Sequence, residues 1–212
     1  MQSLFVTATS TNVGKTYTTI KLIKLLASKG YKVGVFKPIE TGVVHMAPDA
    51  TMLLKACQKV NSKFKDLNPL DITAYTFTLP SAPFCADTAN SIKIEKIIEK
   101  YHALCKLCDI LLVEGAGGLL VPITKNYTML DLIKELNIKT LLVTPSRLGC
   151  INDTMLSMEV LKAKNIDFDW CVNLHEDKED FKEVTQPYYD AVLPKWWSVD
   201  DGLQKYVNQF NS

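Results

Sequence analysis

The chain has 212 residues, 47% of them hydrophobic and 22% charged, and its formal net charge is +1. This length and composition suit one large globular domain with a full core. The near-zero charge gives no electrostatic basis for binding nucleic acid or a membrane surface, and no stretch approaches the roughly 20 apolar residues of a membrane span. The lack of a secretory signal pattern and the six scattered cysteines favour a cytoplasmic protein with reduced thiols.

Apolar strand-like segments alternate with longer helical patterns along the chain. The short apolar runs are continuous, which is typical of strands buried on both faces, whereas the longer segments carry an apolar stripe at helical spacing. In chain order we expect a strand at 4–6, a helix at 15–29, a strand at 33–36, helices at 49–58 and 92–108, strands at 110–113 and 141–143, a helix at 151–164 and a strand at 170–172. This alternation predicts a single α/β domain over 1–212, with a mainly parallel sheet flanked by helices.

The first strand leads into the segment TATSTNVGKT (7–16), whose last three residues are those that end a phosphate-binding loop. The common pattern, G-x-x-x-x-G-K-[ST], has a glycine where this chain has Thr9. A position between a strand and a helix is the context that the motif requires, because free N–H groups and the helix dipole then face the phosphates. Lys15 would pair with the β- and γ-phosphates, and the Thr16 hydroxyl would bind magnesium. We favour this P-loop NTPase fold over a plain turn eased by Gly14.

The second strand is followed by FKPIETG (36–42). A lysine close to the phosphates, here Lys37, would stabilise charge that develops during phosphoryl transfer. A lone lysine before a proline is more often a surface residue, and only the recurrence of charged groups at three strand ends favours the functional interpretation. Asp49 opens the next helix, where capping the helix and binding magnesium are equally supported.

The segment EGAGG (114–118) directly follows the strand at 110–113. Open α/β sheets bind ligands at the carboxyl ends of their strands. A carboxylate there, supplied by Glu114 and facing a phosphate-binding loop, suits magnesium, and the glycines let the backbone approach a reacting group. The alternative is a glycine-rich turn with a solvated glutamate.

Other conspicuous residues favour structural interpretations. Cys105 and Cys108 form a C-x-x-C pair, a spacing found in metal and redox sites, but both continue the apolar stripe of their helix and we expect core packing. Cys150 is better suited to packing than to nucleophilic attack. Trp196 and Trp197 are expected to pack against the last helix, with base stacking as the less favoured alternative.

Taken together, these segments resemble the dethiobiotin synthase family, whose phosphate-binding loop reads approximately G-T-D-T-x-V-G-K-T. The chain matches it from Thr9 onward, with Ala8 in place of the family's first glycine and Ser10 in place of its aspartate. Further matches are to K-P-x-x-[ST]-G at 37–42, Y-T-F-x-x-P-x-x-P at 75–83, E-G-A-G-G at 114–118 and L-G-C-I-N at 148–152. The matches run in family order as far as Asn173, and their combination is specific.

The resemblance implies an ATP-dependent (nucleoside triphosphate-dependent) enzyme that makes dethiobiotin from 7,8-diaminononanoate and carbon dioxide. The reaction would pass through a carbamate and a carbamic–phosphoric anhydride before the ureido ring closes. It implies magnesium as cofactor, and a homodimer with the substrate site near the subunit interface, because in the family the substrate's distant carboxylate reaches the partner subunit. The alternative from another class is a P-loop nucleotide-switch ATPase that acts on a protein partner.

The resemblance also assigns roles to individual residues. Lys15 and Lys37 are expected to be catalytic, and Thr16, Asp49 and Glu114 to hold magnesium. The expected nucleotide-binding residues are Asn12, Val13, Gly14, Lys15, Thr16, Tyr17, Asp49, Glu114, Gly115, Ala116, Gly117 and Asn173. The expected substrate-binding residues are Thr11, Lys37, Thr41, Gly117, Gly118, Gly149, Cys150, Ile151 and Asn152. The last four open a helix, whose free N–H groups suit a carboxylate.

Overall fold

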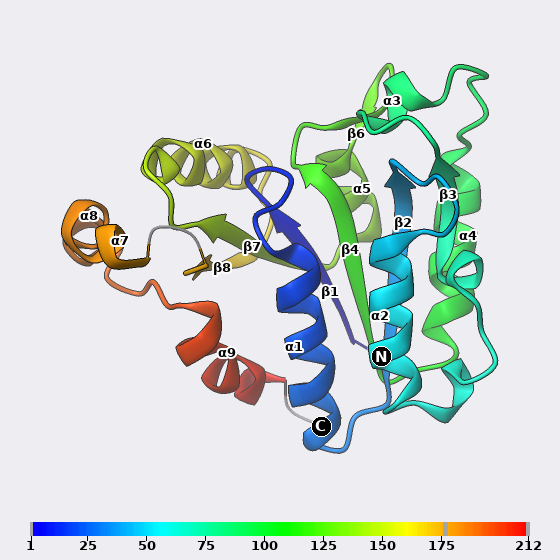
Figure 1. Ribbon diagram of the computed structural model, residues 1–212, viewed down its shortest axis with the longest axis horizontal. Helices are drawn as coiled ribbons and strands as arrows, with labels where there is room; N and C mark the ends of the chain where they lie inside the picture. Colours follow the sequence, from blue (N-terminus) through cyan, green and yellow to red (C-terminus); the bar gives the residue numbers. More distant parts are fainter. Residues whose placement is uncertain (1, 176–177, 211–212) are drawn as a thin grey trace.

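The computed structural model describes residues 2–175 and 178–210, and its centre is a six-stranded sheet whose neighbouring strands all run parallel (Figure 1). The strands are β1 (Gln2–Ala8), β2 (Val33–Thr41), β3 (Thr73–Phe77), β4 (Ile110–Gly118), β7 (Lys139–Pro145) and β8 (Phe168–Asn173), in the spatial order β3-β2-β4-β1-β7-β8. A short antiparallel pair, β5 (Pro122–Thr124) and β6 (Tyr127–Thr128), follows β4.

Helices connect the strands and cover both faces of the sheet (Figure 1). The α-helices are α1 (Lys15–Ser28), α2 (Pro48–Gln58), α3 (Pro83–Ala86), α4 (Ile94–Cys105), α5 (Met129–Leu136), α6 (Cys150–Ala163), α7 (Lys178–Val184), α8 (Gln186–Val192) and α9 (Val199–Tyr206), and the 3-10 helices are η1 (Ser62–Phe64), η2 (Pro69–Ile72) and η3 (Val207–Gln209). Among the described residues, none of these helices combines the length and apolarity needed to cross a bilayer.

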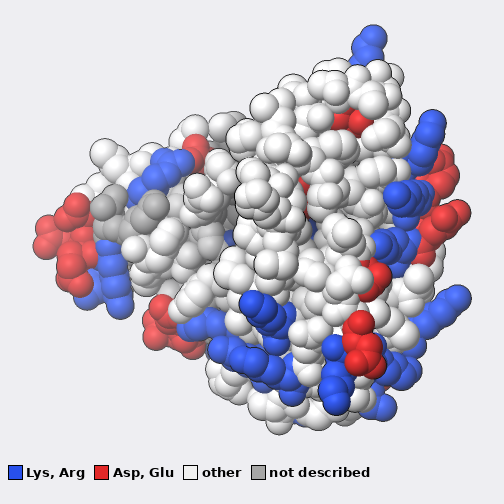
Figure 2. All heavy atoms as spheres, turned by 45° about the vertical axis from the view of Figure 1, so that its right-hand side comes forward, with Lys and Arg blue, Asp and Glu red and all other residues white. Residues whose placement is uncertain are grey.

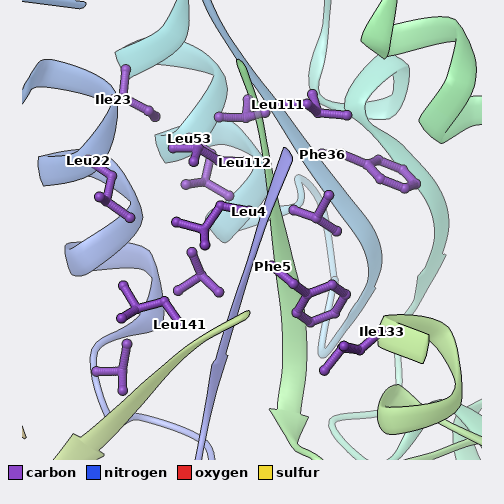
Figure 3. Close-up of a cluster of buried hydrophobic side chains, with 14 of the residues drawn as sticks. Leu4, Phe5, Leu22, Ile23, Phe36, Leu53, Leu111, Leu112, Ile133 and Leu141 are labelled. Carbon is purple, nitrogen blue, oxygen red and sulfur yellow. The ribbon is translucent and has the colours of Figure 1, made fainter. Parts of the chain in front are cut away.

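The core lies on both faces of the sheet, because successive side chains of a strand point to opposite sides. On β1, Leu4 points toward Leu22 of α1, whereas its neighbour Phe5 points toward Ile133 of α5 (Figure 3). All four side chains are buried. Burying each side chain stabilises the fold by about 1.5–3 kcal/mol relative to leaving it exposed. Two adjacent residues of β1 therefore pack against helices on opposite faces of the sheet and stabilise both layers.

The chain leaves β1 and β4 in opposite directions across the sheet. From β1 it passes through α1 to β2, on the far side of β4, and from β4 it passes through α5 to β7, on the far side of β1. The loops after these two neighbouring strands therefore diverge and leave a crevice at their carboxyl ends. The carboxyl edge of the sheet is at the top of Figure 1. In Figure 2 the upper part of the visible face is largely uncharged, whereas Lys and Arg side chains gather lower down.

Every strand and helix expected from the sequence is present, with ends that differ by a few residues. The largest differences are in β2 and β4, which each extend five residues beyond their expected ends at 36 and 113. Helix α4 begins at Ile94 and not at 92, and ends at Cys105 and not at 108. The N–H of Ile92 donates to the Asp87 carboxylate at 2.8 Å, and the N–H of Lys93 donates to the Tyr75 hydroxyl at 2.8 Å. These bonds hold the chain in a non-helical path until the helix starts.

The elements that were not expected include β3, an edge strand of the sheet, and the helix α5. The segment TAYTF of β3 was treated only as a family motif, although it is rich in strand-forming residues. The start of α5 carries a capping box, in which Thr128 and Asp131 satisfy each other's backbone N–H groups, and Asn137 ends the helix in the left-handed conformation. Both capping signals are readable in the sequence.

The interpretations of cysteine and tryptophan are mostly confirmed. Cys105 and Cys108 are free thiols packed against the core, and no group of three His, Cys, Asp or Glu residues within 2–175 and 178–210 is placed to hold a metal ion. Trp197 stacks on Tyr206 of α9, with ring centroids 5.1 Å apart. The expectation for Trp196 was wrong, because this ring packs against Phe181 of α7 and Tyr189 of α8.

Candidate active site

The loop after β1 closes tightly against the end of β8. Asn173 Nδ2 donates to the carbonyl oxygen of Val13 at 2.9 Å. Gly14 has φ of +100°, and a Cβ atom at this position would lie 2.0 Å from Asn173 Nδ2. A side chain here would meet both backbone strain and a clash. The first residue of the GKT signature must therefore be glycine, because of its positive φ and the close approach of Asn173.

Lys15, the first residue of α1, folds back over the loop that precedes it. Its Nζ donates to the Ser10 carbonyl at 2.9 Å, and the residue is buried. Burial, with a smaller contribution from the nearby Lys37 ammonium, lowers the pKa of Lys15 to about 8. A negative charge bound next to the loop would raise the pKa of Lys15 and so favour its protonated form.

Lys37 of β2 lies between two carboxylates that come from different elements. Its Nζ is 2.8 Å from Glu114 Oε1, in the middle of β4, and 3.0 Å from Asp49 Oδ2, in the first turn of α2. Lys37 and Glu114 were expected just after their strands, but both strands continue past them. Burial alone would lower the pKa of Lys37, but the two carboxylates outweigh it and raise the pKa above its ordinary value. The lysine is therefore a permanently charged group inside the protein. The surface interpretation of Lys37 is wrong.

Glu114 connects this charge cluster to the phosphate-binding loop. Its Oε1 accepts a hydrogen bond from Thr16 Oγ1 at 2.8 Å as well as from Lys37. Its Oε2 is buried and has no hydrogen-bond partner among the described residues. The solvated-glutamate interpretation is wrong, because the residue is 0% exposed.

These oxygens fit magnesium, a hard cation that prefers carboxylate and hydroxyl ligands. Asp49 does not cap α2, since its carboxylate bonds to Lys37. Thr16, Asp49 and Glu114 therefore present oxygen donors around one point, with the Glu114 Oε2 lone pairs unused by the described residues.

A pocket of about 500 Å³ opens in front of this cluster. Of the residues expected to bind nucleotide, magnesium or substrate, it is lined by Thr11, Asn12, Gly14, Lys15, Thr16, Tyr17, Lys37, Thr41, Asp49, Ala116, Gly117 and Asn173. Val13, Glu114 and Gly115 lie directly behind its wall, where Val13 bonds to Asn173 and the other two bond to Lys37. The structure thus brings together every expected nucleotide-binding residue.

A second pocket, of about 830 Å³, adjoins the first and shares four lining residues with it, namely Thr11, Thr41, Ala116 and Gly117. Gly118 also lines it, and a Cβ atom on this glycine would lie 2.9 Å from the Thr9 carbonyl oxygen. The rest of its wall is mainly apolar, from Pro80, Pro83, Leu119, Leu120, Val121, Leu156 and Val160. The two pockets form a polar and an apolar compartment that meet at the carboxyl edge of the sheet.

The expected substrate-binding segment Gly149–Asn152 lines neither of these pockets. It opens α6, with Gly149 at φ of +89°. The side chain of Cys150 is buried beneath α8, where the Tyr189 hydroxyl lies 3.7 Å from its sulfur, which confirms a packing role for that side chain. Asn152 is exposed.

Four pocket residues were not anticipated from the sequence, and they are Ile39, Glu40, His175 and Asp200. Asp200, in the first turn of α9, accepts a hydrogen bond from the Tyr17 hydroxyl at 2.8 Å and pairs with Lys21. These contacts join residues about 180 positions apart, so no local pattern reports them. Glu40 could have been noticed as a lone carboxylate in a buried apolar strand.

A parallel sheet, a phosphate-binding loop after its first strand and a carboxylate on the neighbouring strand define a nucleotide-binding protein of the P-loop class. The fold is shared with the MinC:MinD cell division complex of Aquifex aeolicus, at a TM-score of 0.55 and 18% identity over 99% of this chain and 86% of that chain. It is also shared with a ParA family ATPase of Chlorobium tepidum, at a TM-score of 0.55 and 10% identity over 96% and 87%. A family described as "AAA domain" matches residues 2–180.

Sequence relatives narrow the class. The chain is 67% identical to the ATP-dependent dethiobiotin synthetase BioD of Sulfurovum sp. (strain NBC37-1), over 98% of this chain and 99% of that protein. It is 38% identical to the protein of the same name from Aquifex aeolicus and 35% identical to that from Wolinella succinogenes, each over at least 96% of both chains. The chain belongs to the ATP-dependent dethiobiotin synthetase family.

Proposed function

We propose that this chain uses ATP to close the ureido ring of dethiobiotin, from 7,8-diaminononanoate and carbon dioxide. The observation that carries the proposal is the meeting of Lys15, Lys37 and Glu114, from α1, β2 and β4, at the wall of one pocket. Lys37 and Glu114 are 2.8 Å apart, and Lys15 lies close enough for its pKa to respond to both.

The two compartments suit the two substrates. The first pocket offers the phosphate-binding loop and the charge cluster to a triphosphate, with Asn173 beyond the loop. The second offers an apolar wall to the hydrocarbon chain of a diamine. Thr11 and Thr41 line both pockets and would hydrogen-bond the diamine or its carbamate where the two substrates meet.

The chemistry follows in three balanced steps. One amine adds to carbon dioxide and loses a proton, which gives a carbamate. A carbamate oxygen attacks the γ-phosphorus, and ADP leaves, which gives a carbamic–phosphoric anhydride. The second amine attacks the carbonyl carbon, loses a proton and expels inorganic phosphate. Lys15 and Lys37 would neutralise the negative charge that moves between these oxygens, and positioning of the two substrates would supply much of the remaining rate.

Magnesium would be held by Thr16, Asp49 and Glu114. When bound, it would neutralise charge on the phosphoryl oxygens. Asp49 and Glu114 also hold Lys37 in place, and Thr16 bonds to Glu114, so the charge cluster would serve the cation and the lysine together.

We also propose that two copies of the chain associate around the second pocket, and that the enzyme works in the cytoplasm. Leu156 of α6 lines this pocket and is 60% exposed, and Leu148, before α6, is 78% exposed. An apolar patch of this kind supports a protein interface. It would bring Gly149–Asn152 of one subunit toward the substrate of the other. Six free cysteines support a reducing compartment.

Phosphate release tests the function. A ring-closing synthetase should release phosphate from ATP rapidly only when 7,8-diaminononanoate and bicarbonate are both present, and dethiobiotin should form in equal amount. A nucleotide-switch ATPase should release phosphate at the same rate with and without these compounds. The second result would reject the proposal and favour the alternative.

A further inference from the structure

Helix α2 begins without a capping side chain of its own. Its N-cap residue is Ala47, and its first residue, Pro48, has no N–H group. The N–H of Thr51 donates to the Ala47 carbonyl at 2.9 Å, which is the first bond of the helix. The free N–H groups of the first turn are therefore those of Asp49 and Ala50.

One carboxylate from another element, that of Glu40 on β2, accepts hydrogen bonds from both N–H groups. Glu40 Oε1 accepts the N–H of Asp49 at 2.7 Å, and Glu40 Oε2 accepts the N–H of Ala50 at 2.9 Å. Glu40 is only 3% exposed and forms part of the wall of the first pocket. A buried carboxylate that accepts two N–H bonds at a helix start is a strong, directional contact.

The strand β2 thus holds Asp49 at two points. Glu40 fixes its backbone, and Lys37, three residues earlier on the same strand, binds its carboxylate at 3.0 Å. The other polar contact between α2 and β2 among the described residues, from Cys57 Sγ to the Val33 carbonyl oxygen at 3.0 Å, lies near the opposite end of the helix. Glu40 and Lys37 are therefore the polar contacts that set the position of the first turn relative to the charge cluster.

We propose that Glu40 is a positioning residue, which places the Asp49 carboxylate for magnesium and nucleotide binding. The family pattern K-P-x-x-[ST]-G leaves this position open, so no motif assigns the role. The proposal rests on the magnesium role of Asp49 in the proposed function. Glu40 acts through Asp49, and its removal should therefore change nothing once Asp49 has lost its charge.

The test measures how much magnesium strengthens the binding of a non-hydrolysable ATP analogue, as the ratio of the Kd values without and with magnesium in calorimetric titrations. Asp49→Asn should reduce this ratio by about tenfold, which is typical for lost metal-site contacts. Glu40→Ala should reduce it by a similar factor. The double variant should equal Asp49→Asn alone, because the two changes remove the same interaction. The amide oxygen of Glu40→Gln keeps one hydrogen-bond acceptor, so its Kd ratio should lie between those of Glu40→Ala and the wild type. If Glu40→Ala does not fold, Glu40→Gln alone provides the test.

Asp71→Ala is the matched control. The Asp71 carboxylate accepts the N–H of Asn68 at 2.8 Å at the start of η2, which leads into the amino end of β3 and lies away from both pockets. It should lower the melting temperature and leave the Kd ratio unchanged. The proposal would be overturned if both Glu40 variants kept the wild-type Kd ratio. It would also be overturned if the reduction in the double variant were the product of the reductions in Glu40→Ala and Asp49→Asn. Neither result would contradict the proposed function. An unchanged ratio in Asp49→Asn would overturn the proposal together with the magnesium role of Asp49.

Discussion

Lys37 Nζ lies 2.8 Å from Glu114 Oε1, and the two side chains are 3% and 0% exposed. The residues come from neighbouring strands, β2 and β4, so the sheet itself sets their distance. A buried pair of this kind contributes little net stability, but removing one partner leaves an uncompensated charge in the interior. The pair is therefore better explained by chemistry than by stability.

Lys37→Met should abolish most ring closure and also weaken the fold. We expect kcat to fall by about 100-fold or more, as for the loss of a preorganised electrostatic contact. The free energy of unfolding should fall by about 3–5 kcal/mol, because Glu114 is left buried without its main partner. Steady-state kinetics and urea denaturation measure the two effects. The double variant Lys37→Met/Glu114→Gln should regain stability without activity, and near-normal turnover in either variant would remove Lys37 from the catalytic residues.

Glu114→Gln should weaken the response to magnesium. The amide keeps the shape but loses the charge that favours a divalent cation. The magnesium concentration for half-maximal ring closure should rise by about tenfold, within the range seen when groups around a metal are changed. A magnesium titration at saturating ATP measures this, and a superimposable curve would contradict the role.

Nucleotide binding should take up a proton in alkaline solution. The pKa of Lys15 is about 8, against an ordinary value of 10.5, and a bound triphosphate should raise it. Below the lower pKa, Lys15 is protonated before and after binding. At about pH 9 it is largely neutral before binding and charged afterwards, so affinity should fall as pH rises, by up to about tenfold per unit. Calorimetry in two buffers of different ionisation enthalpy measures the uptake, and equal uptake at about pH 7 and pH 9 would contradict it.

Gly14→Ala should eliminate tight nucleotide binding. The added Cβ would lie 2.0 Å from Asn173 Nδ2 at a φ of +100°, and a loop displaced by about 1 Å loses about 100-fold in function. Gly30→Ala is the matched control, since Gly30 has φ of +92° but a Cβ there would meet no described atom within 4 Å. Gly30→Ala should cost about 1–2 kcal/mol of stability from backbone strain alone and leave the Kd for ATP unchanged. Similar Kd values for both variants would show that the Asn173 contact is unimportant.

Leu156→Glu should separate the proposed dimer. A charge in an apolar interface is poorly solvated, so light scattering should report a monomer. Ring closure should fall, whereas ATP binding should persist because Leu156 lies outside the first pocket. Leu70→Glu introduces the same charge at another side chain that is also 60% exposed, on η2. A dimer that survives Leu156→Glu, or that is lost equally in Leu70→Glu, would contradict the assigned interface.

The sequence predicted the part of the site that depends on neighbouring parallel strands, although Lys37 and Glu114 lie within β2 and β4 and not after them. Lys15, Lys37 and Glu114 each follow an apolar run, and parallel strands bring their carboxyl ends to one edge. It did not exclude a capping role for Asp49, because the residue that accepts the free N–H groups of α2 is Glu40, from a different element. No sequence pattern indicated that Asp200 belongs to the site, since its partner Tyr17 lies 183 positions away.

The end of the chain forms part of the first pocket. The N–H of Val172 donates to the Trp197 carbonyl at 2.9 Å, Asp200 bonds to Tyr17, and the Tyr31 hydroxyl donates to the Phe210 carbonyl at 2.6 Å. During synthesis the phosphate-binding loop emerges from the ribosome long before α9, and its pocket gains Asp200 only once α9 has been translated. A nascent chain therefore completes this wall of the pocket only after α9 has emerged, and ATP would stabilise molecules that contain α9 over molecules truncated before it.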